Sequence, residues 1–258
     1  MKKTKLILVR HGMTDDNSKE VFCGITDSPL SELGYQQAEA VAEKLYDLTN
    51  IDAIYCSPLK RTLDTAYPIA NKFNREINIL DDLKEINGGD WEYKTHEYIA
   101  MHWPKEYIVW QEDPGFHQMP NGDSVESLQK KLITAVNNII EQNQGQTVCL
   151  MTHGVSIRLL MCYFHGLKLE DVKTVKWCNN TGINIIEHDN LTKELSVVLE
   201  GYDCHLEKKD LKVHSHLDMT KFVNIAKREV EKAELATKIL RTSTSPEKTS
   251  PRNILAFA

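Results

Sequence analysis

Two histidines follow apolar segments of the chain, at positions where a strand would end. Arg10 and His11 come directly after the largely apolar residues 4–9, and His153 follows a second apolar run, residues 147–152. Arginine and histidine are costly to bury unless they are paired, so packing alone explains them poorly. Ligand sites of open α/β sheets lie outside the carboxyl ends of the strands. We therefore expect these side chains to belong to a functional site.

Arg61 and Glu85 add a cation and a carboxyl group to the two histidines. We expect Ser57 to cap a helix that starts at Pro58, which places Arg61 in its first turn. A cation there opposes the helix dipole, and a phosphate bound beside it would reverse that penalty. Glu85 comes just after a further strand-like segment, residues 77–80. Together, these residue types point to the binding of a phosphate group.

The elements that position these residues alternate between strand-like and helical patterns. Strands are expected at residues 4–9, 53–56, 77–80, 147–152, 183–186 and 196–199. Helices are expected after Ser31, from Pro58, from Asp123 or Ser124 to Gln142, and over 155–164. This alternation predicts an α/β fold, a three-layer α/β/α sandwich with a largely parallel central sheet.

Two stretches interrupt the alternation. Residues 89–120 are rich in aromatic side chains without a clean period, and we expect a small helical cap insertion there. Residues 205–258 are highly charged, contain an amphipathic helical pattern from Met219 to Leu240, and end in a tail rich in Ser, Thr and Pro. The expected organisation is a catalytic domain over 1–204, which includes the cap, followed by a charged helical extension and tail.

Composition excludes several classes of protein. The net charge of −6 argues against a nucleic-acid binder, and no apolar run reaches the roughly 18 residues that span a bilayer. The apolar stretch near the N-terminus is too short for a signal peptide, and the six cysteines form no CxxC pair. We expect a cytoplasmic protein with reduced thiols and no membrane partner. The histidines His214 and His216 lack the companions of a zinc site, so no metal is expected.

The chain resembles the histidine phosphatase superfamily, in the branch that includes the phosphoglycerate mutases and many small-molecule phosphatases. The resemblance covers about the first 200 residues in the expected order, which is more specific than one short motif. Its motifs are Arg10-His11-Gly12-Met13-Thr14 with Asn17, then Asp27, Pro29-Leu30 and Gly34, Ser57-Pro58-Leu59 with Arg61, Glu85, Trp91-Glu92, residues 120–124, and His153-Gly154 with Arg158.

The resemblance implies a role for each site residue. His11 attacks phosphorus and is transiently phosphorylated, while Arg10, Arg61 and His153 hold the phosphoryl oxygens. Glu85 protonates the leaving oxygen and then deprotonates a water molecule. Physical chemistry agrees, because neighbouring guanidinium groups keep an imidazole neutral and match phosphate oxygens without a metal or another cofactor.

The pocket that receives the phosphate is also implied by the resemblance. Its lining would comprise Thr14, Asn17, Cys23, Gly24 and Gly154, in addition to the cationic residues. The substrate would be a small phosphorylated metabolite, and a homodimer could form through the charged C-terminal helix.

Three functions are compatible with this site. Phosphoglycerate mutases carry a pair of arginines after the acid, whereas residues 89–120 here contain none. Val155 stands where the mutases carry a polar asparagine. Both departures favour a phosphomonoesterase. The aromatic residues of the expected cap predict a preference for substrates that carry an apolar or aromatic portion. The alternatives are a cofactor-dependent phosphoglycerate mutase and a catalytically weak regulatory phosphate-binding protein.

Overall fold

A computed structural model describes residues 3–207, 211–212 and 219–243, with side chains described as far as residue 236. The expected tail after residue 243 and the pair His214 and His216 lie outside the described residues.

A six-stranded sheet with the order β3-β2-β4-β1-β5-β6 forms the centre of the molecule. Its strands are β1 (Thr4–Arg10), β2 (Ala53–Cys56), β3 (Ile77–Ile79), β4 (Thr147–Thr152), β5 (Ile183–His188) and β6 (Leu195–Tyr202). The first four strands run parallel, β5 is antiparallel to β1, and β6 is antiparallel to β5. The prediction of a largely parallel sheet is confirmed, and it places the ends of β1 and β4 side by side, with Arg10 opposite Thr152.

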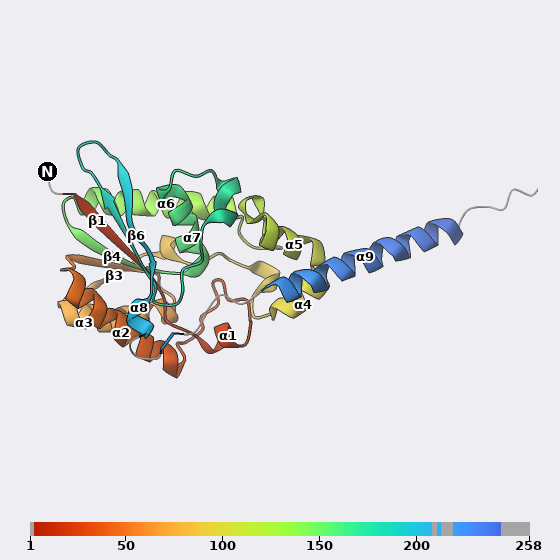
Figure 1. The fold of residues 1–258 in the computed structure, drawn as a ribbon, viewed down its shortest axis with the longest axis horizontal. Helices are drawn as coiled ribbons and strands as arrows, with labels where there is room; N and C mark the ends of the chain where they lie inside the picture. Colours follow the sequence, from red (N-terminus) through yellow and green to blue (C-terminus); the bar gives the residue numbers. More distant parts are fainter. Residues whose placement is uncertain (1–2, 208–210, 213–218, 244–258) are drawn as a thin grey trace, which may run out of the picture.

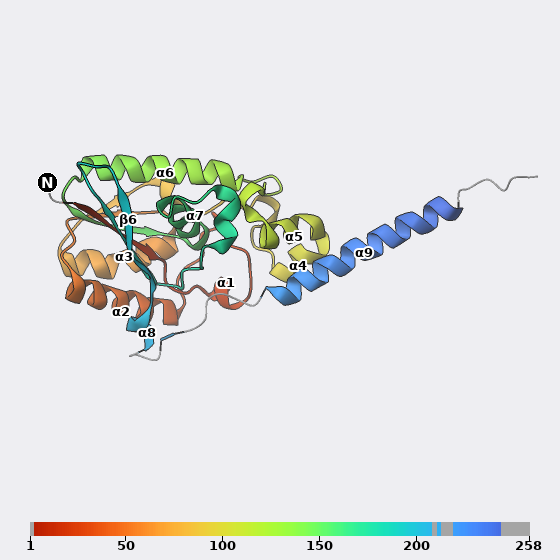
Figure 2. The same ribbon diagram turned by 45° about the horizontal axis from the view of Figure 1, so that its top comes forward.

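Helices cover both faces of this sheet, as Figures 1 and 2 show. One face packs against α2 (Glu32–Leu48) and α3 (Lys60–Phe73), and the other against α6 (Val125–Gln142) and α7 (Gly154–Phe164). Along β1, Ile7 and Val9 join the first core, whereas Leu6 and Leu8 join the second. Side chains of a strand alternate between its two faces, so a continuous apolar strand requires cover on both. The expected three-layer sandwich is confirmed.

The starts of the helices agree with the sequence at two positions and differ at a third. Ser31 caps α2 and Ser124 caps α6, each accepting a backbone N–H three residues on at 3.1 Å. The prediction that Ser57 caps a helix beginning at Pro58 is wrong: α3 begins at Lys60, after Leu59, without a side-chain cap. The hydroxyl of Ser57 lies 2.8 Å from His153 and accepts from the N–H of Leu59 at 3.4 Å, so its contacts lie outside the helix.

Residues 89–120 form a small helical subdomain at one end of the sheet. It contains η2 (Gly89–Trp91), α4 (His96–His102), α5 (Pro104–Glu112) and η3 (Pro114–Phe116). Trp91 and Tyr107 are fully buried, and Trp91 packs edge-on against Phe22 and Trp110. These aromatic residues belong to the same hydrophobic core as α6 and α7, so the subdomain packs directly onto the sheet layers. The expected helical cap is confirmed.

Four of the remaining helices are short: α1 (Asp15–Ser18), η1 (Asp81–Leu83), η4 (Leu169–Thr174) and α8 (Cys204–Glu207). Helix α9 (Thr220–Ser243) lies along α4 and α5 with its first turns and then projects away from the body (Figures 1 and 2). Within the described ranges, no helix is long and apolar enough to cross a bilayer.

Candidate active site

His11 follows β1 directly, and its ring is held in one tautomer. Its Nδ1 lies 2.7 Å from the carbonyl oxygen of Gly12. A carbonyl oxygen can only accept a hydrogen bond, so Nδ1 donates and the lone pair of Nε2 remains available. The turn requires glycine at position 12, because a Cβ there would lie 2.6 Å from the carbonyl oxygen of Gly34.

Burial and two cations keep the His11 ring neutral. The residue is only 4% exposed, and burial lowers its pKa well below the usual value, followed by the charges of Arg61 and Arg10. A neutral imidazole with a free Nε2 lone pair is the form that can attack an electrophile. The ring is therefore neutral, as expected for a nucleophile, and its tautomer leaves Nε2 free to attack.

The two arginines approach His11 from different parts of the chain. Arg10 closes β1, and its guanidinium donates to the carbonyl oxygen of Cys178 at 2.8 Å. Arg61, in the first turn of α3, donates to the carbonyl oxygens of Thr26 and Gly24, each at 2.6 Å. Burial lowers the pKa of both guanidinium groups, and the charge of Glu85 raises it again. Arginines retain their proton under such shifts, so the site keeps two positive charges.

His153 follows β4 and packs against the first histidine, with ring centroids 5.4 Å apart. Its Nδ1 accepts a hydrogen bond from Nε of Arg61 at 3.2 Å. The proton of the neutral ring is therefore on Nε2, which donates to the hydroxyl of Ser57 at 2.8 Å. Burial and the charge of Arg61 lower the pKa of His153 well below its usual value. In this arrangement both ring nitrogens are engaged by protein atoms.

Glu85 lies at the N-terminus of α7. Its carboxyl accepts hydrogen bonds from the backbone N–H of Val155 at 2.9 Å and from the backbone and hydroxyl of Ser156 at 3.1 and 3.0 Å. Burial raises the pKa of Glu85, and the Val155 and Ile86 N–H groups counteract this. The carboxyl is 7% exposed, so its proton is held more tightly than on a surface glutamate, at a fixed position.

A pocket between the sheet end and the cap, here called the central pocket, contains several of the predicted residues. Arg10, Asn17, Cys23, Glu85 and Gly154 line it. Burial and the nearby Asp16 carboxylate raise the pKa of the Cys23 thiol to about 12, so the thiol stays protonated and contributes a neutral side chain to the pocket wall.

The other predicted residues lie outside the lining of the central pocket. Among them are His11, Arg61 and His153, whose side chains are buried. The hydroxyl of Thr14 accepts from the N–H of Asn17 in a capping box at the start of α1. The carbonyl of Gly24 is held by Arg61. Thr14 and Gly24 thus position their neighbours in this structure, and their contact with a ligand stays a prediction.

Comparison with known proteins establishes the family. Residues 6–200 match the histidine phosphatase superfamily (branch 1). The chain belongs to this superfamily. The match covers more than half of the chain, and the predicted family and phosphatase activity are confirmed together.

Individual relatives agree with that assignment. Phosphoserine phosphatase 1 of Hydrogenobacter thermophilus is 30% identical over 211 residues, which is 81% of this chain and 98% of the relative. The metal-independent phosphoserine phosphatase of Arabidopsis thaliana is 30% identical over 71% of this chain and 76% of its own. The solved structure of Bacillus stearothermophilus YhfR superposes with a TM-score of 0.75 at 32% identity, covering 79% of this chain and 99% of that one.

Glu92 is a residue of this histidine phosphatase whose importance sequence reasoning missed. Its carboxylate accepts hydrogen bonds from the backbone N–H groups of Gly24, Ile25, Thr26 and Gly88, and from the hydroxyl of Thr26. The same loop turns its carbonyls toward Arg61. Glu92 therefore fixes the loop of residues 24–26, and the carbonyl oxygens of this loop fix the Arg61 guanidinium group. The family motif Trp91-Glu92 marked the position without indicating this contact.

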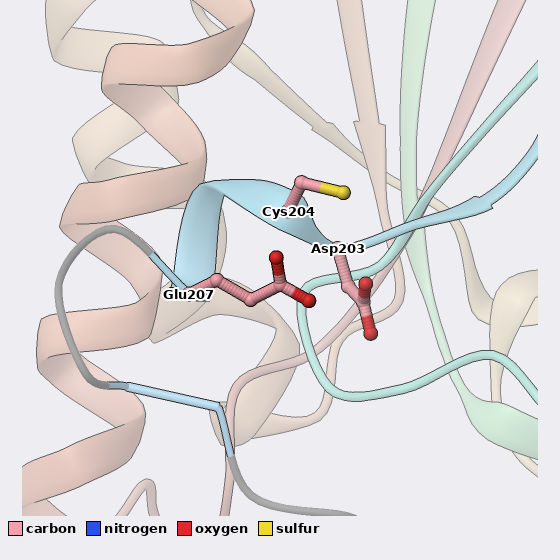
Figure 3. Close-up of side chains that lie close together, drawn as sticks. All are labelled: Asp203, Cys204 and Glu207. Carbon is pink, nitrogen blue, oxygen red and sulfur yellow. The ribbon is translucent and has the colours of Figure 1, made fainter.

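One cluster of potential metal ligands occurs among the residues that the structure describes. Figure 3 shows Asp203, just before α8, with Cys204 and Glu207 at the two ends of this short helix; their ligand atoms lie within 4.8 Å of one another. The ammonium group of Lys212 lies 3.2 Å from Asp203 and 2.7 Å from Glu207, and Asn179 donates to Asp203 at 2.6 Å. A lysine already compensates these carboxylates, so the cluster is an ion-pair network of the phosphatase.

Proposed function

We propose that the chain is a metal-independent phosphomonoesterase that works through a phosphohistidine at Nε2 of His11. One observation carries the proposal: the hydrogen bond from Nδ1 to Gly12 fixes the tautomer whose Nε2 lone pair is free. The charges of Arg10 and Arg61 act on this ring, and the buried carboxyl of Glu85 lies near both arginines. Phosphoryl transfer depends mainly on positioning and on electrostatic stabilisation, and this set of residues supplies both.

In the first step, the Nε2 lone pair of His11 forms a bond to phosphorus while the bond from phosphorus to the ester oxygen breaks. Arg10 and Arg61 balance the negative charge of the phosphoryl oxygens. Glu85 gives its proton to the departing oxygen, so the alcohol leaves neutral. Glu85 and Arg10 line the same pocket, which agrees with these complementary roles.

In the second step, the Glu85 carboxylate accepts a proton from a water molecule. The water oxygen forms a bond to phosphorus, and the bond to His11 breaks. Inorganic phosphate leaves, and both side chains return to their starting protonation states. A direct contact of His153 with a phosphoryl oxygen requires its Nε2–H to turn away from Ser57.

The walls of the central pocket favour substrates with an apolar or aromatic portion. Phe22, Trp110 and Trp177 contribute to its lining. An adjoining side pocket of about 460 Å³ shares Trp110 and Trp177 with it and is also lined by Arg158 and Val175. Flat aromatic walls bind rings and alkyl groups better than compact polyanions. Phosphoserine belongs in the substrate panel because two relatives are phosphoserine phosphatases.

The wider organisation is part of the proposal. Residues 1–204 are the catalytic domain, with residues 89–120 as its cap, and residues 205–258 are an extension. Six free thiols support a cytoplasmic location. The proposed homodimer is tested by light scattering of the purified chain, which measures its molar mass in solution.

A substrate screen tests the function. It compares phenyl phosphate, phosphoserine, 3-phosphoglycerate, sugar phosphates and nucleotides by phosphate release, with His11→Ala as the control. Hydrolysis is expected to be fastest for phenyl phosphate and to disappear in the variant. Phosphoglycerate isomerisation with 2,3-bisphosphoglycerate is measured in parallel. Isomerisation faster than all hydrolysis would contradict the proposal and favour a mutase.

A further inference from the structure

The central pocket extends beyond the site residues to Met219, just before α9. Its lining includes Arg10, Glu85 and Gly154 of the site, and also Glu20, His96 and Met219. Met219 immediately precedes α9 and packs on the main hydrophobic core. The hydroxyl of Tyr107, in α5, lies 3.8 Å from its sulfur. A side chain from outside the family match, which ends at residue 200, thus forms a wall of the pocket.

Apolar packing fixes α9 in this position. Phe222 is 3% exposed, and its ring lies 6.0 Å from that of His96, which lines the pocket from α4. Ala226, one turn further along, is fully buried. The helix runs beside α4 and α5 in both views (Figures 1 and 2). Because side chains at i and i+4 share one helix face, Phe222 and Ala226 define the face that docks on the cap.

Ion pairs on either side of this face set its register. Lys221 lies 2.7 Å from the carboxylate of Glu20, and Lys227 lies 2.7 Å from that of Glu112. Glu20 belongs to the loop after α1, so the first pair ties α9 to the same loop that carries Cys23 and that directly follows the helix of Asn17. The second pair ties α9 to the end of α5. The helix therefore bridges the phosphate side of the pocket and the cap.

The pair between Glu20 and Lys221 also changes the charge at the pocket. A carboxylate in the lining repels an incoming phosphate dianion, and a neighbouring ammonium group cancels that repulsion. Lys221 is half exposed, so its effect should be modest and sensitive to salt.

We propose that the start of α9 is a specificity element of the phosphatase, in which Met219 limits the size of the leaving group and Lys221 neutralises Glu20 for anionic substrates. This inference rests on the proposed function, because it assigns the outer wall of the same pocket. Its ligands are phosphomonoesters whose leaving group extends from the phosphate toward the cap.

The first experiment compares phenyl phosphate with the bulkier naphthyl phosphate. Met219→Ala removes most of the thioether side chain, and it should raise the ratio of kcat/KM for naphthyl over phenyl phosphate by about three- to tenfold. Leu235→Ala is the matched control, since Leu235 is on the same helix and is 60% exposed. Circular dichroism checks that both variants fold. A ratio that does not rise above that of the control overturns the size-limiting role.

The second experiment isolates the charge. Lys221→Ala should raise KM for phenyl phosphate about two- to fivefold at low ionic strength, leave kcat unchanged, and lose this effect at high salt. Lys232→Ala is the control, because Lys232 forms an ion pair along its own helix, with Glu229 at 2.7 Å. Equal KM values for the two variants overturn the neutralising role. If the unmodified chain hydrolyses no phosphomonoester, the proposed function itself fails, which is a separate result.

Discussion

Nε of Arg61 donates a hydrogen bond to Nδ1 of His153 across 3.2 Å, and this contact determines where the imidazole carries its proton. Arginine can only donate, so Nδ1 keeps its lone pair and Nε2 carries the hydrogen. The two other nitrogens of the same guanidinium group hold the carbonyls of Gly24 and Thr26. One side chain thus joins the second histidine to the loop that Glu92 organises.

Arg61→Lys should therefore disrupt three contacts while conserving charge. A lysine ammonium group cannot reproduce the planar fork, and we expect kcat/KM to fall about 100- to 1,000-fold. Arg75→Lys is the matched control, because Nε of Arg75 also donates to a carbonyl, that of Ile51 at 3.0 Å, and Arg75 follows the opposite end of α3 from Arg61. Steady-state kinetics on phenyl phosphate measures both. Equal losses in the two variants would speak against a specific role for Arg61.

Glu85→Gln tests the acid role through the leaving group. A glutamine cannot donate the catalytic proton, so turnover of phenyl phosphate should fall about 100- to 10,000-fold. Dinitrophenyl phosphate has a leaving group that needs no proton, so its turnover should fall less than about tenfold in the variant. The ratio of the two kcat values is the measurement. A uniform loss for both substrates would refute the acid role.

The pH profile gives a second measure of the same carboxyl. Burial raises the pKa of Glu85, so it keeps its proton to a higher pH than an exposed glutamate does. The kcat for phenyl phosphate should fall as the pH rises through this pKa, because the acid form is consumed. The Glu85→Gln variant should lack this decrease of kcat at higher pH. A decrease that persists in the variant would mean that another group causes it.

Glu92→Gln provides the contrast to Glu85→Gln. The neutral amide weakens the hydrogen bonds that the carboxylate accepts from Gly24, Ile25 and Thr26. Because this acts through the position of Arg61, activated and unactivated substrates should be slowed to the same degree, by about tenfold or more. A dependence on the leaving group in this variant would show that Glu92 takes part in proton transfer.

Particular residues show what the sequence could and could not predict. The ends of β1 and β4 were predictable because both strands are buried on both faces and read as continuous apolar runs. Ser57 was misassigned because a local Ser-Pro signal competes with a hydrogen bond to His153, 96 residues away. The role of Glu92 and the docking of α9 depend equally on partners distant in sequence. Local patterns carry no information about such partners.

Stability should fall as the pH is lowered, because buried histidines are neutral in the folded protein. Burial lowers the pKa of both His96 and His117 from 6.5 to about 4. Between these values the unfolded chain binds protons that the folded chain does not. Each histidine therefore lowers the free energy of unfolding by up to about 1.4 kcal/mol per pH unit as the pH falls from 6.5 toward 4.

Urea denaturation at several pH values measures this slope. His117→Phe removes one titrating group from the cluster around Trp91 and should flatten the curve. His102→Gln, at an exposed position of α4, is the control variant. A free energy of unfolding that is constant between pH 6.5 and 4.5 would contradict the assignment of neutral buried histidines.

The most direct test of the proposed mechanism is to trap the covalent intermediate on His11. Rapid quenching in alkali after mixing with substrate labelled in its phosphoryl group should give a labelled protein whose label is stable to base and released by acid. Peptide mapping should place the phosphoryl group on Nε2 of His11, and His11→Ala should carry none. Rapid phosphate release by the unmodified chain without any labelled protein, or a label on another residue, would contradict the phosphohistidine mechanism.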